Sequence, residues 1–427
     1  MTEKSQYSLK LLEELEDQVN SCINCGFCES VCPTLPSSGF RSSIGARGRV
    51  DLGKEMIREY KGKGLIELKI DESFYSCLDC YACLQVCPAG VNAGKVSEIG
   101  KEIITSGELT VKDQKNPIAD MIVELTMKYR NPLGIREVCA RWSKGLEFEP
   151  ESTNLLYTGN MYQMMAYNET LGKMERSMGE TFSRNMAGYL SRHSGLSKYI
   201  KYFRNKKTER EMNGYLRNIY DLLRDSDIKF NYLQEEEPYP GTFIYDLGYE
   251  KEFSEYAKYL CDLYHKRNVK TIITVDPHTY DLLKNTISLY APDFDFNVIY
   301  YLDLLKESDF EGTSENITYH EPCHLVLRGE GYNRPKMLLE SIATVNMPVR
   351  SGKKVFCCGG PDELLYGKLS SNISEERFRQ LKETGSEKII TACPICLSNL
   401  KKDDSVEDIS SYLIKRRRDN SKKVRES

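Results

Sequence analysis

Two runs of cysteine with identical spacing constrain this chain more than any other feature. In each run, successive cysteines are separated by two, two and three residues, and a proline follows the last one. Three thiolates spaced this closely can bind three irons of one cubane, whereas the fourth lies about one helical turn further on and points elsewhere. The pattern predicts two 4Fe-4S clusters. The runs are Cys22, Cys25, Cys28 and Cys32, and then Cys77, Cys80, Cys83 and Cys87.

The fourth cysteine of each run is expected to complete the other cluster. One cubane is then bound by Cys22, Cys25, Cys28 and Cys87, and the other by Cys77, Cys80, Cys83 and Cys32. Pro33 and Pro88 restrict the backbone after the last ligands. Paired zinc knuckles are the alternative, but they leave no role for a proline-terminated fourth cysteine. Two closely held clusters without an open coordination position conduct electrons and do not transform a substrate.

Cysteine usage points to metal binding and not to disulfides. Thirteen of the 15 cysteines stand in groups, while Cys139 and Cys261 stand alone and are expected to be small buried apolar residues. Because no apolar segment with a cleavage site follows Met1, we expect a reducing cytoplasmic location, where disulfides are rare. No apolar run of about eighteen residues is present, so membrane contact is expected only at the periphery of the inner face.

The charge distribution argues against nucleic-acid binding. The 427 residues carry a net charge of -4, whereas neutralising phosphates needs a concentrated basic surface. The exception is the end of the chain, where a solvated tail is the common explanation and docking to a partner or an anionic lipid surface is the alternative. The basic residues there are Lys415, Arg416, Arg417, Arg418, Lys422, Lys423 and Arg425.

A second group of five cysteines follows near the C-terminus. Its members are Cys323, Cys357, Cys358, Cys393 and Cys396, and Gly359 and Gly360 allow the backbone to approach a bound centre closely. Five thiolates exceed what tetrahedral zinc needs, which favours a polynuclear iron-sulfur centre. Zinc on four of the five cysteines and a redox disulfide between Cys393 and Cys396 are the alternatives.

An internal repeat organises the rest of the chain. The segment 271–279 matches 388–396, and 155–160 corresponds to 317–323, so each copy is expected to contain two strands, each followed by a turn and a helix. The first copy also holds an insertion of about 45 residues near 198–207. Helices are expected from residue 9 to 20, and again between Cys32 and Cys77.

The order of these parts resembles that of the CCG-domain iron-sulfur proteins. This family includes the glycolate oxidase iron-sulfur subunit, heterodisulfide reductase subunits and lactate-utilisation proteins. The likeness rests on both cysteine patterns, on Cys357-Cys358-Gly359, and on the stretch from Gly45 to Arg49. It implies a non-cubane 4Fe-4S cluster, or alternatively zinc, in an intact CCG repeat. The first copy departs from the family pattern because it has Asn160, Tyr239, Asp276 and Thr279 at the ligand positions.

The predicted fold is α+β with α/β repeats. It consists of a helical dicluster ferredoxin domain (1–100), a connector (101–150), a degenerate CCG-type repeat without cysteine ligands (151–310), an intact CCG repeat (311–410) and a basic tail (411–427). Three histidines, His278, His320 and His324, fall beside ligand positions. One of them could donate a hydrogen bond to cluster sulfide or pass a proton during reduction, although satisfied polar groups are the more common explanation at strand ends.

The resemblance implies the iron-sulfur subunit of an oxidoreductase that accepts electrons from a separate FAD-containing dehydrogenase acting on glycolate or D-lactate. No G-x-G-x-x-G fingerprint follows a strand in this chain, so the flavin is expected on another polypeptide. A membrane-associated acceptor is a further expected partner. Two alternatives remain: reduction of a small disulfide at the five-cysteine site, and a zinc-stabilised interaction module.

Overall fold

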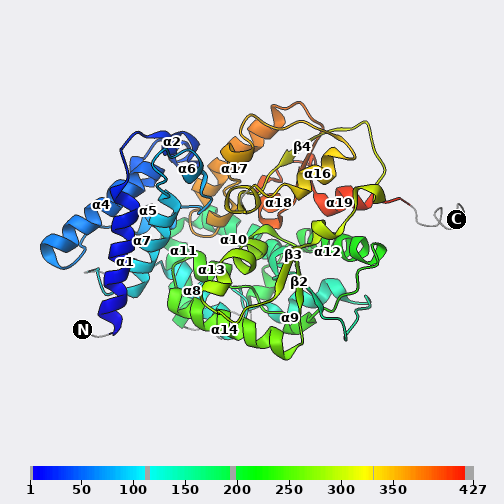
Figure 1. The fold of residues 1–427 in the computed structure, drawn as a ribbon, viewed down its shortest axis with the longest axis horizontal. Coiled ribbons are helices and arrows are strands. Elements are labelled where there is room, and N and C mark those ends of the chain that lie inside the picture. The colour runs from blue at the N-terminus through cyan, green and yellow to red at the C-terminus, as the bar shows by residue number, and fades with distance from the viewer. Residues whose placement is uncertain (1–2, 111–115, 193–198, 330, 419–427) are drawn as a thin grey trace, which may run out of the picture.

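The computed structural model describes residues 3–110, 116–192, 199–329 and 331–418, which form three packed units (Figure 1). A helical unit at the N-terminal end lies beside two α/β units, and each α/β unit contains one parallel sheet. The coarse fold expected from the sequence, helices followed by mixed α/β structure, is confirmed.

In the helical unit, three long helices pack on one another. Leu11, Leu15 and Val19 lie on one buried face of α1, which packs against α4 and α7. The helices predicted before the first cysteine run and between the two runs are therefore confirmed. The helix α7 continues past residue 100, so the unit is longer than its predicted boundary. Its helices are α1 (Glu3–Asn20), α2 (Phe27–Val31), α3 (Thr34–Ser37), η1 (Ser42–Ile44), α4 (Ala46–Lys63), α5 (Asp71–Tyr75), α6 (Ala82–Gln85) and α7 (Ala93–Ser106).

The segment expected to be a connector is instead packed into the α/β core. It contains α8 (Pro117–Tyr129), α9 (Arg136–Cys139) and η2 (Ala140–Ser143). Trp142 is buried and donates from Nε1 to the Tyr232 hydroxyl at 3.0 Å, and α8 packs against α11. Apolar side chains on these helices, among them Ile118, Ile122 and Leu125, give the segment a buried face.

The first sheet has the order β1-β2-β3 and is entirely parallel. Leu155 pairs with Ile272, which pairs in turn with Val298. The strands β1 (Asn154–Tyr157) and β2 (Thr271–Thr274) match the prediction, whereas β3 (Asn297–Tyr300) was missed. The helices of this unit are α10 (Met161–Met178), α11 (Glu180–Arg192), α12 (Lys206–Asp225), η4 (Gln234–Glu236), α13 (Thr242–Asp246), α14 (Glu250–Lys266), α15 (Pro277–Asp281), η5 (Leu282–Thr286), η6 (Ile287–Leu289), η7 (Tyr301–Leu304) and η8 (Glu307–Asp309).

The second sheet is also parallel, with the order β5-β4-β6-β7. Its strands are β4 (Asn316–His320), β5 (Thr344–Val345), β6 (Lys388–Thr391) and β7 (Val406–Asp408), of which β5 and β7 were not expected. Both are short and carry little pattern of their own. The helices are η9 (His324–Arg328), α16 (Arg334–Glu340), η10 (Gly352–Lys354), η11 (Gly360–Asp362), α17 (Gly367–Lys382), α18 (Pro394–Leu400) and α19 (Ile409–Ile414).

The described part of the basic tail belongs to the folded unit. Arg416 pairs with Glu315, and Arg417 pairs with Asp309 at 3.5 Å. The remaining basic residues of the tail, from 419 onward, and Lys198 of the predicted insertion lie outside the described residues. Cys139 and Cys261 are buried, as predicted. None of the described helices combines the length and the apolar character that crossing a bilayer requires.

Candidate iron-sulfur centres

The first cavity of the helical unit brings together the four cysteines that the sequence groups as one cluster. Its lining includes Cys22, Cys25, Cys28 and Cys87. Cys22 and Cys25 lie in the turn before α2, Cys28 lies in the first turn of α2, and Cys87 lies in the loop after α6. Cys25 is exposed and the other three are half-buried, so this cavity lies near the surface.

The second cavity lies deeper and holds the complementary four thiols. Its lining includes Cys32, Cys77, Cys80 and Cys83. Burial raises the pKa of Cys83 to about 12 and that of Cys77 to about 11. Four convergent thiols in a largely apolar cavity fit a 4Fe-4S cluster, which stabilises thiolate by its own positive charge.

Arg49 joins the two cysteine runs at the second cavity. Its buried guanidinium donates to the Ser73 carbonyl at 2.7 Å, to the Thr34 hydroxyl at 3.2 Å and to the Ser76 hydroxyl at 3.1 Å. A further contact reaches the Cys32 sulfur at 3.9 Å. The sequence singled out this stretch only by resemblance, and the structure gives it a physical role: a fixed cation beside the thiols.

At the carboxyl edge of the second sheet, the five cysteines of the C-terminal group are all buried. The sulfurs of Cys323 and Cys357 are 3.9 Å apart. Hydrogen bonding to the Cys357 and Cys396 thiols lowers the pKa of Cys358 to about 6. Cys393 begins α18, and its sulfur accepts a hydrogen bond from the Cys396 amide at 3.5 Å. All 15 cysteines lie in the described residues and carry free thiols.

The three histidines occupy two positions around this group. His320, at the end of β4, lies with Cys358 and Cys396 such that their potential ligand atoms are within 4.8 Å of one another. The Arg377 Nε donates to its Nδ1 at 3.1 Å. His324 approaches the Cys323 sulfur at 3.6 Å and stacks on His278 with ring centroids 3.7 Å apart. Burial holds the pKa of all three well below the usual histidine range, which favours neutral imidazole.

The corresponding edge of the first sheet carries oxygen atoms in place of sulfur. Asn160, Tyr239, Asp276 and Thr279 are all buried there. The Asp276 carboxylate begins α15 and accepts a hydrogen bond from the Thr279 amide at 2.9 Å. Burial raises the pKa of Asp276 to about 6. Hard oxygen atoms are poor ligands for iron-sulfur centres, and of the two described sheet edges only the second offers sulfur atoms in their place.

The second cavity and the five-cysteine group are neighbours. Arg350 donates to the carbonyl of Val31, beside Cys32, at 2.7 Å, and its guanidinium lies 4.5 Å from the ring of Phe356, beside Cys357. Sequence spacing gave no sign of this junction, because its contacts join segments more than 300 residues apart.

The fold and these sites define a protein built to hold iron-sulfur clusters, and comparison with known proteins agrees. A 4Fe-4S dicluster domain model matches residues 18–91, and a cysteine-rich (CCG) domain model matches residues 317–401. These two matches, together with relatives named as iron-sulfur subunits of glycolate oxidase and subunits of heterodisulfide reductase, support the resemblance to the CCG-domain iron-sulfur proteins.

Three relatives align along most of this chain. A heterodisulfide reductase subunit of Methanosarcina barkeri is 23% identical and covers 92% of both chains. A probable glycolate oxidase iron-sulfur subunit of Bacillus subtilis is 25% identical over 90% of this chain and 89% of its own. A probable membrane-anchored ferredoxin of Chromohalobacter salexigens is 25% identical over 90% of this chain, which spans only 56% of that protein.

Proposed function

We propose that this chain is an electron-transfer subunit that accepts electrons from a FAD-linked 2-hydroxyacid dehydrogenase, such as one acting on glycolate or D-lactate. The observation that carries the proposal is the sequence of three thiol groups from the surface inward. Cys25 is exposed at the first cavity, the second cavity is deeper, and the five-cysteine group is fully buried. Iron-sulfur clusters bound at these places would accept and release single electrons.

The ligand assignment follows from this arrangement. Two cubane clusters would be held by the two sets of four cysteines that line the cavities, and a non-cubane 4Fe-4S cluster by Cys323, Cys357, Cys358, Cys393 and Cys396. Arg49 and Arg350 would orient the loops that carry these thiols. The apolar lining of both cavities would exclude water from the sites.

The first sheet is, in this proposal, a degenerate copy of the second. At each edge a short helix follows the strand, and the residue before the helix accepts a hydrogen bond from the amide three residues later. This residue is Asp276 at the first edge and Cys393 at the second. A single CCG-type centre suits one-electron transfer better than the cleavage of a disulfide by two such centres.

The surface near Cys25 suits an electron-donating partner. Ile23 and Phe27 flank this cysteine and are 67% and 58% exposed, which is unusual for large apolar side chains. We propose that the flavoprotein docks here, in the reducing cytoplasm. The membrane-anchored relative supports an acceptor at the inner face of the membrane.

Co-purification tests the proposal. The tagged chain is isolated anaerobically from its native source under mild conditions, and the proteins that accompany it are identified. We expect a flavin-containing partner, about twelve irons per chain and cluster reduction on adding the hydroxyacid. Isolation without a flavoprotein, or clusters that stay oxidised with every hydroxyacid tried, would contradict the partner assignment.

Two other functions each have one observation in their favour. Reduction of a small disulfide is favoured by the alignment with the heterodisulfide reductase subunit of Methanosarcina barkeri along 92% of this chain, and turnover of disulfides with reduced dye would support it. A zinc-stabilised module is favoured by the grouping of His320, Cys358 and Cys396. About eight irons and one zinc per chain would support that function.

A further inference from the structure

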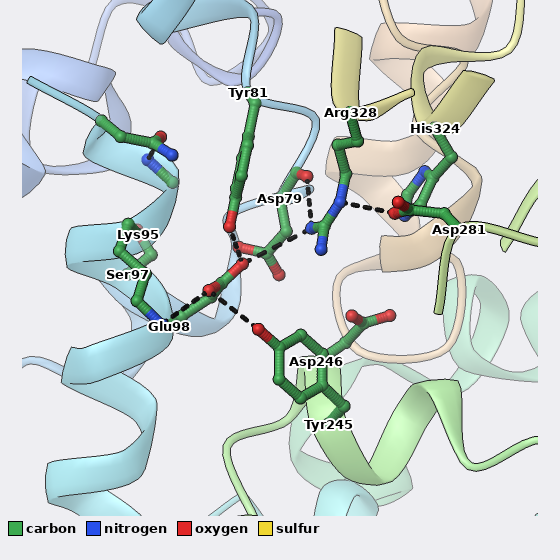
Figure 2. A network of polar contacts seen from close by, with 12 residues as sticks. Asp79, Tyr81, Lys95, Ser97, Glu98, Tyr245, Asp246, Asp281, His324 and Arg328 are labelled. Carbon is green, nitrogen blue, oxygen red and sulfur yellow. Dashed lines mark hydrogen bonds and ion pairs between the residues drawn. The ribbon is translucent and has the colours of Figure 1, made fainter. Parts of the chain in front are cut away.

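Arg328 is a buried cation at the junction of the helical unit and the second α/β unit. It ends η9, the short helix that begins directly after Cys323. Its side chain is only 8% exposed, although an arginine at the end of a helix is usually solvated. Figure 2 shows the guanidinium between Asp79 and Glu98 of the helical unit on one side and Asp281 on the other.

The guanidinium is held by four partners from three parts of the chain. Its Nε pairs with Asp281 of α15 at 2.7 Å, and its Nη1 pairs with Glu98 of α7 at 3.4 Å. The same Nη1 donates to the Asp79 carbonyl at 3.2 Å, and the group lies 4.5 Å from the centre of the Tyr81 ring. A planar fork of donors can make these contacts at once, whereas a lysine ammonium cannot.

Two of these partners belong to the turn that carries the second cysteine run. Asp79 and Tyr81 immediately flank Cys80, whose sulfur lines the second cavity. The Tyr81 hydroxyl donates to Glu98 at 2.5 Å (Figure 2). The Asp79 carboxylate pairs with Lys101 at 2.5 Å. Arg328 thus connects the segment after Cys323 to a turn that is itself anchored on α7.

The charge of Arg328 is as important as its shape. Between two buried sites, where the effective dielectric constant is low, a fixed positive charge favours the more negative, reduced state of each. Asp281 and Glu98 compensate the charge, which is what allows an arginine to remain buried here.

We propose that Arg328 is a positioning residue for electron transfer between the second cubane site and the five-cysteine site. It fixes the separation of the two ligand segments and favours reduction on both sides of the junction. The inference rests on the proposed function, because it needs a redox centre at each site. In the step concerned, one electron moves from one site to the other, no bond forms or breaks, and the electron originates from the reduced flavoprotein.

The test uses the full-length chain with its clusters, prepared anaerobically as wild type, Arg328→Gln, Arg328→Lys and Arg334→Gln. Arg334 is a matched control: it is also largely buried, pairs with Glu307 and donates to the Leu302 carbonyl at 3.2 Å, but these contacts are within the α/β units. Iron content, redox titration followed by electron paramagnetic resonance, and the rate at which the five-cysteine centre is reduced are measured for each.

We expect Arg328→Gln to shift the redox equilibrium of the centres at the junction about tenfold toward the oxidised state, which is about 59 mV lower for a one-electron couple. Reduction of the five-cysteine centre should slow at least tenfold, and the magnetic interaction between the two reduced centres should change. Arg328→Lys should keep the potentials near those of wild type but still slow the transfer, because its single ammonium cannot hold all the partners. If Arg328→Gln loses iron, the inference is judged on the rate of electron transfer in Arg328→Lys.

The inference would be overturned if Arg328→Lys had the same potentials, transfer rate and spectra as wild type and Arg334→Gln. It would also be overturned if Arg328→Gln kept all its iron and had the potentials and transfer rate of wild type. These outcomes leave the proposed function standing when the wild type itself has three reducible centres. A wild type without a reducible five-cysteine centre would overturn the proposed function, and the inference with it.

Discussion

The carboxyl edges of the two parallel sheets have the same backbone design but carry different chemistry. Asp276 begins α15 and Cys393 begins α18, and each side chain accepts a hydrogen bond from the amide three residues later, at 2.9 Å and 3.5 Å respectively. A helix start needs an acceptor, and either oxygen or sulfur can supply it. The comparison teaches that the local fold does not depend on a metal ligand at this position.

The two edges differ in how burial and hydrogen bonding change the pKa values of their polar groups. At the first edge, burial raises the pKa of Glu237 to about 8, even though Thr158 and Tyr232 donate hydrogen bonds to it. At the second edge, mutual hydrogen bonding lowers the pKa of Cys358 to about 6. The first edge is a hydrogen-bonded core of oxygen groups, whereas the second contains a thiol with a lowered pKa, and thiolate is the form that binds iron.

The strongest way to break this comparison is to make the same substitution at both edges. Serine is a good helix cap, so Cys393→Ser and Asp276→Ser both keep the local hydrogen bond. We expect Cys393→Ser to lose about four of about twelve irons per chain and Asp276→Ser to lose none. Iron analysis of anaerobically purified protein measures both, and equal iron in the two variants would contradict the assignment of the edges.

A second prediction concerns two glycines, one at each edge, whose backbone conformation or close neighbours leave little room for a side chain. Gly359 has φ +83°, and an added Cβ would lie 2.9 Å from the Ser370 carbonyl oxygen; Gly241 has φ +92°, and its Cβ would lie 3.0 Å from a ring atom of Tyr256. Alanine should destabilise both edges by about 1–3 kcal/mol, and more at Gly359, where the neighbour is fixed backbone.

Only the Gly359→Ala variant is also expected to lose iron, since the Gly359 amide contacts the Cys357 sulfur at 3.5 Å. Urea unfolding followed by circular dichroism, combined with iron analysis, separates the two effects. A Gly241→Ala variant that loses as much iron as Gly359→Ala would show that the edges are coupled.

A third prediction concerns the pH dependence of the first edge. Because the pKa of folded Glu237 is raised above its value in the unfolded chain, its contribution to stability is present at low pH and is lost as pH rises toward about 8. Glu237→Gln removes this titration. Between about pH 5 and pH 8, the free energy of unfolding of wild type should therefore fall relative to that of the variant, by at most about 1.4 kcal/mol per pH unit. Parallel curves in urea across this range would contradict the prediction.

The same comparison explains which features the sequence could predict. Ligand spacing is local, so the two cysteine runs, the five-cysteine group and the equivalence of Asp276 with Cys393 could all be recognised along the chain. The burial of the isolated thiols followed from their lack of partners. The short strands β5 and β7 carry too few residues for a periodic pattern and were missed.

Junction residues were also beyond prediction, for a different reason. Arg328 contacts Asp79 and Glu98, which lie more than 200 residues away, and nothing near Arg328 in the sequence distinguishes it from a solvated arginine. Sequence patterns report the periodicity of single elements, whereas such contacts depend on how whole units pack.

The smallest expected effect comes from a charge that only the second sheet has. Lys388, the first residue of β6, pairs with Glu315 at 2.8 Å, and both side chains are about one-third exposed. The first residue of β2 is Thr271, so Lys388→Thr gives the second sheet the residue of the first. Solvent screens such a pair, and Glu315 keeps its contacts with Tyr412 and Arg416. We therefore expect the free energy of unfolding to fall by less than about 1 kcal/mol, with a smaller fall in 1 M salt and unchanged iron content.

Urea midpoints at low and high salt measure this loss of stability. A larger, salt-independent loss would mean that Lys388 stabilises the second sheet by packing along Tyr412 and not by charge.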